Sequence, residues 1–268
     1  MANQILISDL SEKAKILRKH VISVASAQES HLGGSLSAAD LMAALYFYYL
    51  RLDDGVSHKD HFLLSKGHAV HILHACMVEK DMVDAAELPR TGMSGSRLGG
   101  HPMLSTPGAE WGTGSLGHAL SVGVGIAIGE TLNQTNSKTV VMLGDGEIQE
   151  GSVWEAALSA PRFGLNKLIA IIDFNKFQGG GNIASVMPIT PLVEKWKAFQ
   201  WNVQEIDGHD MNAIVEALDS TPEKKGPTVI IAHTVKGKGV PGVEGTSRAH
   251  FTKLTKAETE AALTNLEV

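Results

Sequence analysis

The stretch TVVMLGDGEIQEG, residues 139–151, runs from an apolar segment directly into a turn that is rich in glycine and acid. A short apolar run bounded by turn residues is typical of a strand buried in a parallel sheet. Glycine lets the backbone turn tightly and lets a ligand approach it closely. We therefore expect a strand over 139–143 whose carboxyl end presents Asp145 and Glu150 to a bound molecule.

The rest of the chain alternates between apolar runs and segments with helical spacing. Further strands are predicted over 61–65, 168–173, 203–206 and 228–235. Helices are predicted over 11–27, 38–50, 68–80, 116–132, 152–160, 211–218 and 254–268. This alternation indicates an α/β fold, a parallel sheet with helices on both faces, formed by residues 1–268 as a single domain.

Two helix starts and one long loop are also expected. Ser11 is predicted to cap the first helix, and Ser37 and Asp40 to form a capping box at the second. Residues 91–115 are rich in glycine and proline, which predicts an irregular segment. A loop of that length inside a compact domain is usually functional.

The composition excludes several classes of protein. The 268 residues are 43% apolar and 19% charged, which is typical of a globular chain with a sizeable core. The net charge of −6 argues against a general nucleic-acid or membrane-surface binder, since either needs a basic face. Cys76 has no partner for a disulfide within the chain and is expected to be buried. With no signal peptide or membrane-length apolar run in the sequence, a cytoplasmic location is expected.

The glycine-rich turn has the features of a phosphate and metal site. Ligands of such sheets bind beyond the carboxyl ends of the strands. Gly144, Asp145 and Gly146 stand at such an end, and a helix near Ser152 can direct free N–H groups at an anion. A carboxylate beside a phosphate needs a cation between them, and Mg²⁺ is the natural candidate.

The next strand end offers further oxygen ligands. The stretch LIAIIDFNKFQ, residues 168–178, places Asn175 thirty residues after Asp145. The amide oxygen of Asn175 and the backbone carbonyl of Phe177 can complete a set of three protein oxygens.

Several motifs, in order along the chain, resemble the transketolase family. GDGEIQEG followed by DFNKFQ is similar to the thiamine diphosphate signature, and EGSVWEAA after it is typical of transketolases. The supporting motifs are SHLGGSLSAADL (30–41), LSKGHA (64–69), GGHP (99–102) and TGSLGHAL (113–120).

The resemblance implies a thiamine diphosphate-binding fold and half of an enzyme. It spans nearly the whole chain but only the first domain of a conventional transketolase, without the pyrimidine-binding and C-terminal domains. We therefore expect the N-terminal subunit of a split transketolase, active only with a separate C-terminal subunit in a heterotetramer of two copies of each. No nucleic-acid or membrane partner is expected.

The resemblance also implies the residues that hold the cofactor. The divalent cation, Mg²⁺ or another such as Ca²⁺ or Mn²⁺, is expected on Asp145, Asn175 and the Phe177 carbonyl. Thiamine diphosphate is expected to contact His68, Gly114, Ser115, Leu116, Gly144, Gly146 and Glu150. Of these, His68 reaches the diphosphate, and Glu150 links paired cofactor sites across a dimer interface.

The activity implied is transfer of a two-carbon ketol unit from a ketose or ketose phosphate to an aldose or aldose phosphate. The donor's C3 hydroxyl must lose a proton, and the acceptor's aldehyde oxygen must gain one. Imidazole suits both steps because it titrates near neutral pH. The resemblance assigns these transfers to His31 and His250, and a hydrogen bond to the donor's terminal hydroxyl to His101.

Two alternatives and two departures from the family pattern stay open. The chain could be the α subunit of a 2-oxoacid dehydrogenase, or a non-catalytic regulatory subunit that binds thiamine diphosphate. The histidines of SHLGGS and GGHP favour the transketolase. Gly179 replaces an apolar residue that packs on the thiazolium ring in the family, and residues 236–251 also differ. Both departures leave the donor and acceptor sugars undetermined.

Two further patterns have weaker functional interpretations. His68, His71 and His74 recur every three residues, but a zinc site usually includes a Cys, Asp or Glu ligand. We therefore interpret His71 and His74 as packing or surface residues. GTGSLG, residues 112–117, lacks the preceding strand and following acid of a dinucleotide site.

Overall fold

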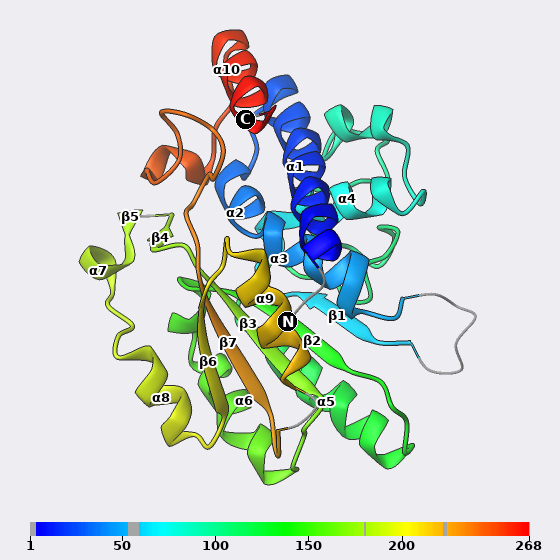
Figure 1. Ribbon diagram of the computed structural model, residues 1–268, viewed down its shortest axis with the longest axis vertical. Coiled ribbons are helices and arrows are strands. Elements are labelled where there is room, and N and C mark those ends of the chain that lie inside the picture. The colour runs from blue at the N-terminus through cyan, green and yellow to red at the C-terminus, as the bar shows by residue number, and fades with distance from the viewer. Residues whose placement is uncertain (1–3, 53–58, 180, 222–223, 268) are drawn as a thin grey trace.

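The protein is described by a computed structural model over residues 4–52, 59–179, 181–221 and 224–267. A five-stranded sheet in the order β1-β2-β3-β7-β6 forms its centre (Figure 1). Its strands are β1 (His61–Leu64), β2 (Thr139–Gly144), β3 (Leu168–Phe174), β6 (Asn202–Asp207) and β7 (Thr228–His233). All neighbouring strands are parallel. The predicted strands are therefore confirmed, and their carboxyl ends meet at one edge.

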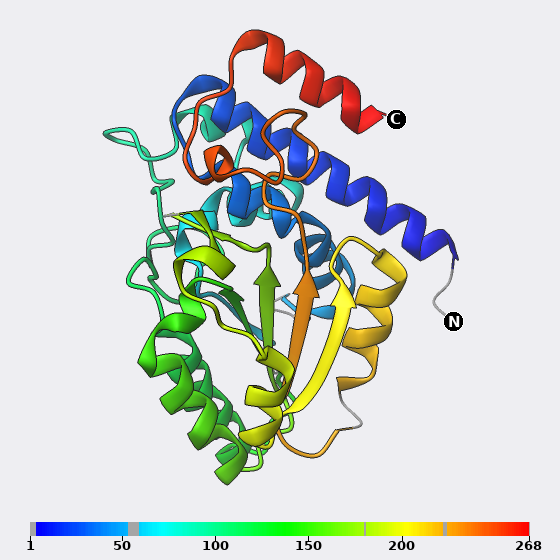
Figure 2. The same cartoon turned by 90° about the vertical axis from the view of Figure 1, so that its left-hand side faces the viewer.

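Helices cover both faces of this sheet, as predicted (Figure 2). One layer contains α1 (Gln4–Ala27), α2 (Leu32–Ser37), α3 (Ala39–Ala44), α4 (Val70–Glu79), α9 (Met211–Asp219) and α10 (Lys256–Glu267). The other contains α5 (Ala119–Leu132), α6 (Gly151–Arg162) and α8 (Leu192–Ala198). Alternate residues of β2 serve the two cores: Val140 and Met142 face the first, Val141 and Leu143 the second.

Shorter elements connect these layers. They are a π-helical turn (Leu45–Tyr49), 3-10 turns (Gly67–Ala69, Ala85–Arg90, Glu147–Gln149, Ser247–His250), a hairpin of β4 (Phe177–Gln178) and β5 (Gly181–Asn182), and α7 (Ile183–Val186). Residues 91–118 form only turns and bends, which confirms the irregular segment. The hairpin, α7 and α8 had no counterpart in the sequence analysis.

The predicted cap at Ser11 is wrong. α1 already includes Gln4, and Ser11 lies inside it, where its hydroxyl donates to the Ile7 carbonyl at 2.8 Å. A hydroxyl can satisfy itself on the preceding turn of a helix, so a serine alone does not mark a helix start. Among the described residues, no helix is long and apolar enough to cross a lipid bilayer.

The predicted capping box at Ser37 and Asp40 is also wrong. Ser37 is the last residue of α2, and its hydroxyl donates to Asp173 at 2.7 Å. Asp40 pairs with Arg18, and α3 begins after Ala38 without a side-chain cap. Both side chains thus bind partners far away in the sequence.

Helix α4 contains buried polar side chains as well as Cys76, which is buried as predicted. His71 and His74 pack inside the protein, and both ring nitrogens of His74 find no partner among the described residues. Burial lowers the pKa of His71 to about 3 and that of His74 to about 4. No cluster of three or more metal-ligating side chains occurs in the described ranges, so the zinc interpretation gains no support.

We expect His74→Leu to weaken the pH dependence of stability. The folded pKa of His74, about 4, lies below its unfolded value, so His74 takes up a proton on unfolding and destabilises the fold as the pH falls below about 6.5. Between pH 7 and pH 5 this proton uptake costs roughly 2 kcal/mol. Urea unfolding of both proteins at the two pH values measures the difference. An unchanged pH dependence in the variant would contradict the assignment.

Candidate active site

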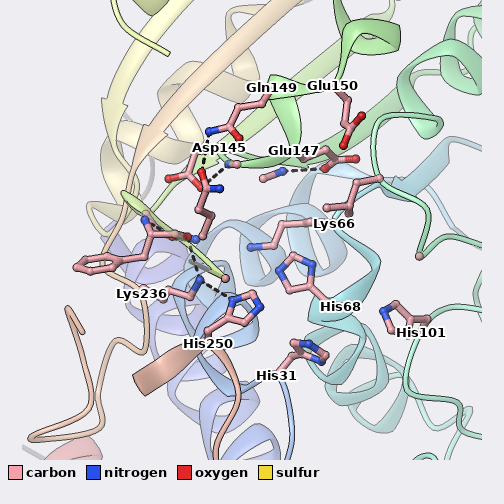
Figure 3. Close-up of a pocket in the computed structure, with 18 residues that line it drawn as sticks. His31, Lys66, His68, His101, Asp145, Glu147, Gln149, Glu150, Lys236 and His250 are labelled. Atoms are coloured by element: carbon pink, nitrogen blue, oxygen red, sulfur yellow. Dashed lines mark hydrogen bonds between the residues drawn. The ribbon is translucent and has the colours of Figure 1, made fainter. Parts of the chain in front are cut away.

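A cleft of about 400 Å³ opens at the carboxyl ends of the strands (Figure 3). Twelve of the thirteen residues singled out from the sequence line it: His31, His68, His101, Gly114, Leu116, Gly144, Asp145, Gly146, Glu150, Asn175, Phe177 and His250. Ser115 is not among the lining residues. Segments from residue 31 to residue 250 therefore meet in one place.

Asp145 lies just beyond β2 and is almost fully buried, with 2% of its surface exposed. Its carboxylate accepts hydrogen bonds from the backbone N–H groups of Gly146, at 2.8 Å, and Lys176. Burial, with a further contribution from the negative charge of Asp173, raises the pKa of Asp145 to about 7. A buried carboxylate that faces a cleft under these conditions fits a site for a cation, which would restore its charged form.

Two further oxygens converge with Asp145. The amide of Asn175 is oriented by Asp173, which accepts from its Nδ2 at 3.0 Å, while its Oδ1 accepts from the Phe177 N–H at 3.1 Å. The Phe177 carbonyl accepts from Lys236 Nζ at 2.9 Å. The predicted metal ligands thus share the cleft with an ammonium group.

Four histidines form the opposite side of the cleft (Figure 3). The ring centroid of His31 lies 5.5 Å from that of His68, 6.0 Å from that of His101 and 5.4 Å from that of His250. Burial is the main cause that lowers the pKa of each ring, to about 4 for His250. The four imidazoles are therefore neutral at pH 7 and can accept protons.

Backbone geometry fits the close approach of a ligand at two glycines. Gly114 has a φ of +150°, which side-chain-bearing residues rarely adopt. A Cβ on Gly146 would lie 2.9 Å from the Cβ of Gln178. Glu150 is exposed at the edge of the same cleft.

Gly179 has an identifiable neighbour. A Cβ at this position would lie 3.4 Å from Nε2 of His250 and 3.8 Å from its Cδ2. His250 therefore packs against the space that a larger side chain at 179 would occupy.

Glu147 is a structural member of the site that the sequence analysis did not single out. It is buried, and its carboxylate accepts from the N–H groups of Gly117 and Gly144, each at 2.9 Å, and from the Ser65 hydroxyl. Although these hydrogen bonds oppose it, burial raises the pKa of Glu147. This one side chain joins three segments of the cleft wall.

Two lysines and Asp173 were also missed. Lys66 and Asp173 form an ion pair with 1% and 0% of their side chains exposed. Burial alone would raise the pKa of Asp173, but the charge and hydrogen bond of Lys66 outweigh it and lower that pKa. Lys66 stands inside the LSKGHA motif and Lys236 follows β7, but lysine is rarely buried, so neither suggested an interior cation.

Comparisons with known protein sequences agree along the chain. The family model described as "Transketolase, thiamine diphosphate binding domain" matches residues 10–267. One of the two-part apulose-4-phosphate transketolase chains of Phocaeicola vulgatus, named as a subunit, is 38% identical over 251 residues, which cover 92% of this chain and 89% of that protein. The 6-deoxy-6-sulfo-D-fructose transketolase subunit SqwG of a Clostridium species is 37% identical, covering 97% and 96%.

Solved structures share the fold over the whole length. The transketolase from Leishmania mexicana has a TM-score of 0.89 at 26% identity, covering 100% of this chain and 42% of that one. The Pichia stipitis transketolase in complex with sedoheptulose-7-phosphate has a TM-score of 0.90 at 29% identity, covering 97% and 41%. This chain spans about two fifths of these solved chains.

Proposed function

Because this chain belongs to the transketolase family, we propose that it is the diphosphate-binding subunit of a two-subunit transketolase. Its relatives of similar length bear the names of transketolase subunits, and longer solved transketolases contain its whole fold. The observation that carries the proposal is the cleft in which Asp145, Asn175 and Phe177 face four histidines.

The residues present fit a divalent cation and a diphosphate. Asp145, Asn175 and the Phe177 carbonyl would hold Mg²⁺, Ca²⁺ or Mn²⁺, since hard cations prefer oxygen ligands. His68 and Gly146 would lie against the diphosphate. When bound, thiamine diphosphate supplies the nucleophilic carbon and the electron sink for breaking the C2–C3 bond of a ketose.

The histidines would then move protons. His31 and His250 are neutral in the free protein, because burial lowers the pKa of each, and can accept the proton of the donor's C3 hydroxyl. The same imidazoles, once protonated, can protonate the aldehyde oxygen of the acceptor. His101 would hold the donor's terminal hydroxyl. Packing of the four rings at 5.4–6.0 Å keeps these groups within reach of one small sugar.

A second subunit would complete the site. In the proposal it contributes the glutamate that acts on the aminopyrimidine ring, in an assembly of two copies of each subunit. The exposed position of Glu150 at the cleft edge supports a role between paired sites.

The test is ketol transfer by the purified chain with and without the product of the neighbouring reading frame. We expect activity only in the mixture, with Mg²⁺ and thiamine diphosphate, and a loss of about 100-fold in kcat for His31→Ala because general acid–base catalysis contributes about 10²- to 10⁴-fold. The donors should include apulose 4-phosphate and 6-deoxy-6-sulfofructose, which the relatives' names suggest. Decarboxylation of a 2-oxoacid would instead indicate the dehydrogenase, and cofactor binding without any turnover the regulatory subunit.

A further inference from the structure

We propose that His209 is a positioning residue of this site: it fixes the backbone at Val235 so that the ammonium of Lys236 is held in the cleft. This inference rests on the proposed function, because Lys236 contacts the carbonyl assigned to the cation. His209 itself does not line the cleft and touches neither the assigned metal ligands nor the four histidines.

His209 lies in the tight turn between β6 and α9, which is packed closely on the end of β7. The N–H of Gly208 donates to the His233 carbonyl at 2.8 Å, and the N–H of His209 donates to the Asp207 carboxylate at 2.9 Å. A Cβ on Gly208 would lie 2.5 Å from Cγ2 of Thr234, so only glycine permits this approach. The turn therefore has one position relative to β7.

The side chain of His209 connects two buried groups. Its Nε2 accepts from the N–H of Val235 at 2.9 Å, so the ring proton must sit on Nδ1, which donates to Asp40 at 2.7 Å. Asp40 is 8% exposed and is held by both Nη atoms of Arg18. Burial alone would raise the pKa of Asp40, but the charge of Arg18 outweighs it and lowers this pKa to about 2, which keeps the carboxylate ionised. Arg18, Asp40 and His209 thus form a fixed chain of hydrogen bonds that ends on a backbone amide.

The residue after that amide carries a cation of the cleft. Lys236 is 2% exposed, and its Nζ donates to the Phe177 carbonyl at 2.9 Å and to Nδ1 of His250 at 3.0 Å (Figure 3). Thr234, on the other side of Val235, is held by Asp173 through its hydroxyl. Each of three consecutive residues after β7 therefore has its own anchor, and only the anchor of Val235 comes from outside the cleft.

A double-mutant cycle separates positioning from general stability. Mg²⁺-dependent binding of thiamine diphosphate to the complete chain is measured by calorimetry for the wild type, His209→Ala, Lys236→Met and the double variant. We expect His209→Ala to weaken binding by about 10-fold, as loss of supporting hydrogen bonds does at metal sites. If His209 acts through Lys236, the double variant binds within about twofold of Lys236→Met alone.

Two further variants control for folding. His209→Gln can still accept and donate with one amide, so it should bind within about threefold of the wild type. His233→Ala removes a matched imidazole–carboxylate pair, His233 to Glu205 at 2.7 Å, that lies outside the cleft, and should leave the affinity unchanged. Melting temperatures of all variants report any general loss of stability.

The outcomes distinguish this inference from the proposed function. Multiplicative losses in the double variant, or a lowered melting temperature of His209→Ala with full affinity, would overturn the positioning role while leaving the proposed function intact. Failure of the wild type to bind thiamine diphosphate with Mg²⁺ would overturn the proposed function, and this inference with it.

Discussion

Asp145→Ala should abolish measurable Mg²⁺-dependent binding of thiamine diphosphate. Asp145 is the only ionisable side chain among the three assigned ligands, and its buried carboxylate has no cation to pair with in the described protein. Loss of outer hydrogen-bond partners of a metal site already costs about 10- to 100-fold in affinity, so loss of a charged ligand should cost at least about 100-fold. Calorimetric titration of the cofactor at fixed Mg²⁺ measures the change.

Two controls define the origin of this loss. Asp145→Asn keeps the size of the side chain but not its charge, and should lose nearly as much affinity. Glu155→Ala removes an exposed acid of α6, outside the cleft, and should bind as the wild type does. Retention of full affinity by Asp145→Ala would refute the metal assignment.

Breaking the pair of Lys66 and Asp173 should cause the largest loss of stability. Neither Lys66→Met nor Asp173→Asn leaves a partner for the remaining buried charge, and an uncompensated charge of this kind costs about 3–5 kcal/mol of unfolding free energy. The double variant removes both charges, while the new amide at 173 keeps the hydrogen bonds with Ser37 and Thr234. We therefore expect it to be more stable than either single variant.

Urea unfolding without cofactor measures all four proteins. An exposed pair on the same chain, Arg97 with Glu87, serves as the comparison, and its loss through Arg97→Ala should change the unfolding free energy very little. Simple addition of the two single losses in the double variant would show that Lys66 and Asp173 do not stabilise the fold as a pair.

The strands and the metal ligands could be predicted because their signals are local. β2 and β3 are apolar runs that end at the turns carrying Asp145 and Asn175, and parallel strands bring such ends together. The helix starts at Ser11 and Ser37 were wrong for the opposite reason. The hydroxyl of Ser37 binds Asp173, 136 residues away, and no local pattern reports that contact.

The buried charges of the site could not be predicted for the same reason. Lys66 pairs with Asp173 across 107 residues, and His209 reaches Asp40 across 169. Lysine and histidine are usually placed at the surface by sequence reasoning, and only the packing of α2, β3 and β7 encloses them. The resemblance of motifs to a family located the cleft, whereas its internal supports are visible only in three dimensions.

The irregular segment 91–118 has a practical consequence for protein engineering. It delivers His101 and Gly114 to the cleft, yet its attachments to the strand scaffold are concentrated at its far end, where Thr113 donates to the Leu64 carbonyl at 2.8 Å and Gly117 to Glu147. The portion before Thr113 is thus a cassette: exchanging it for the matching piece of a relative would alter the rim that meets incoming sugars while leaving the scaffold's buried joints untouched.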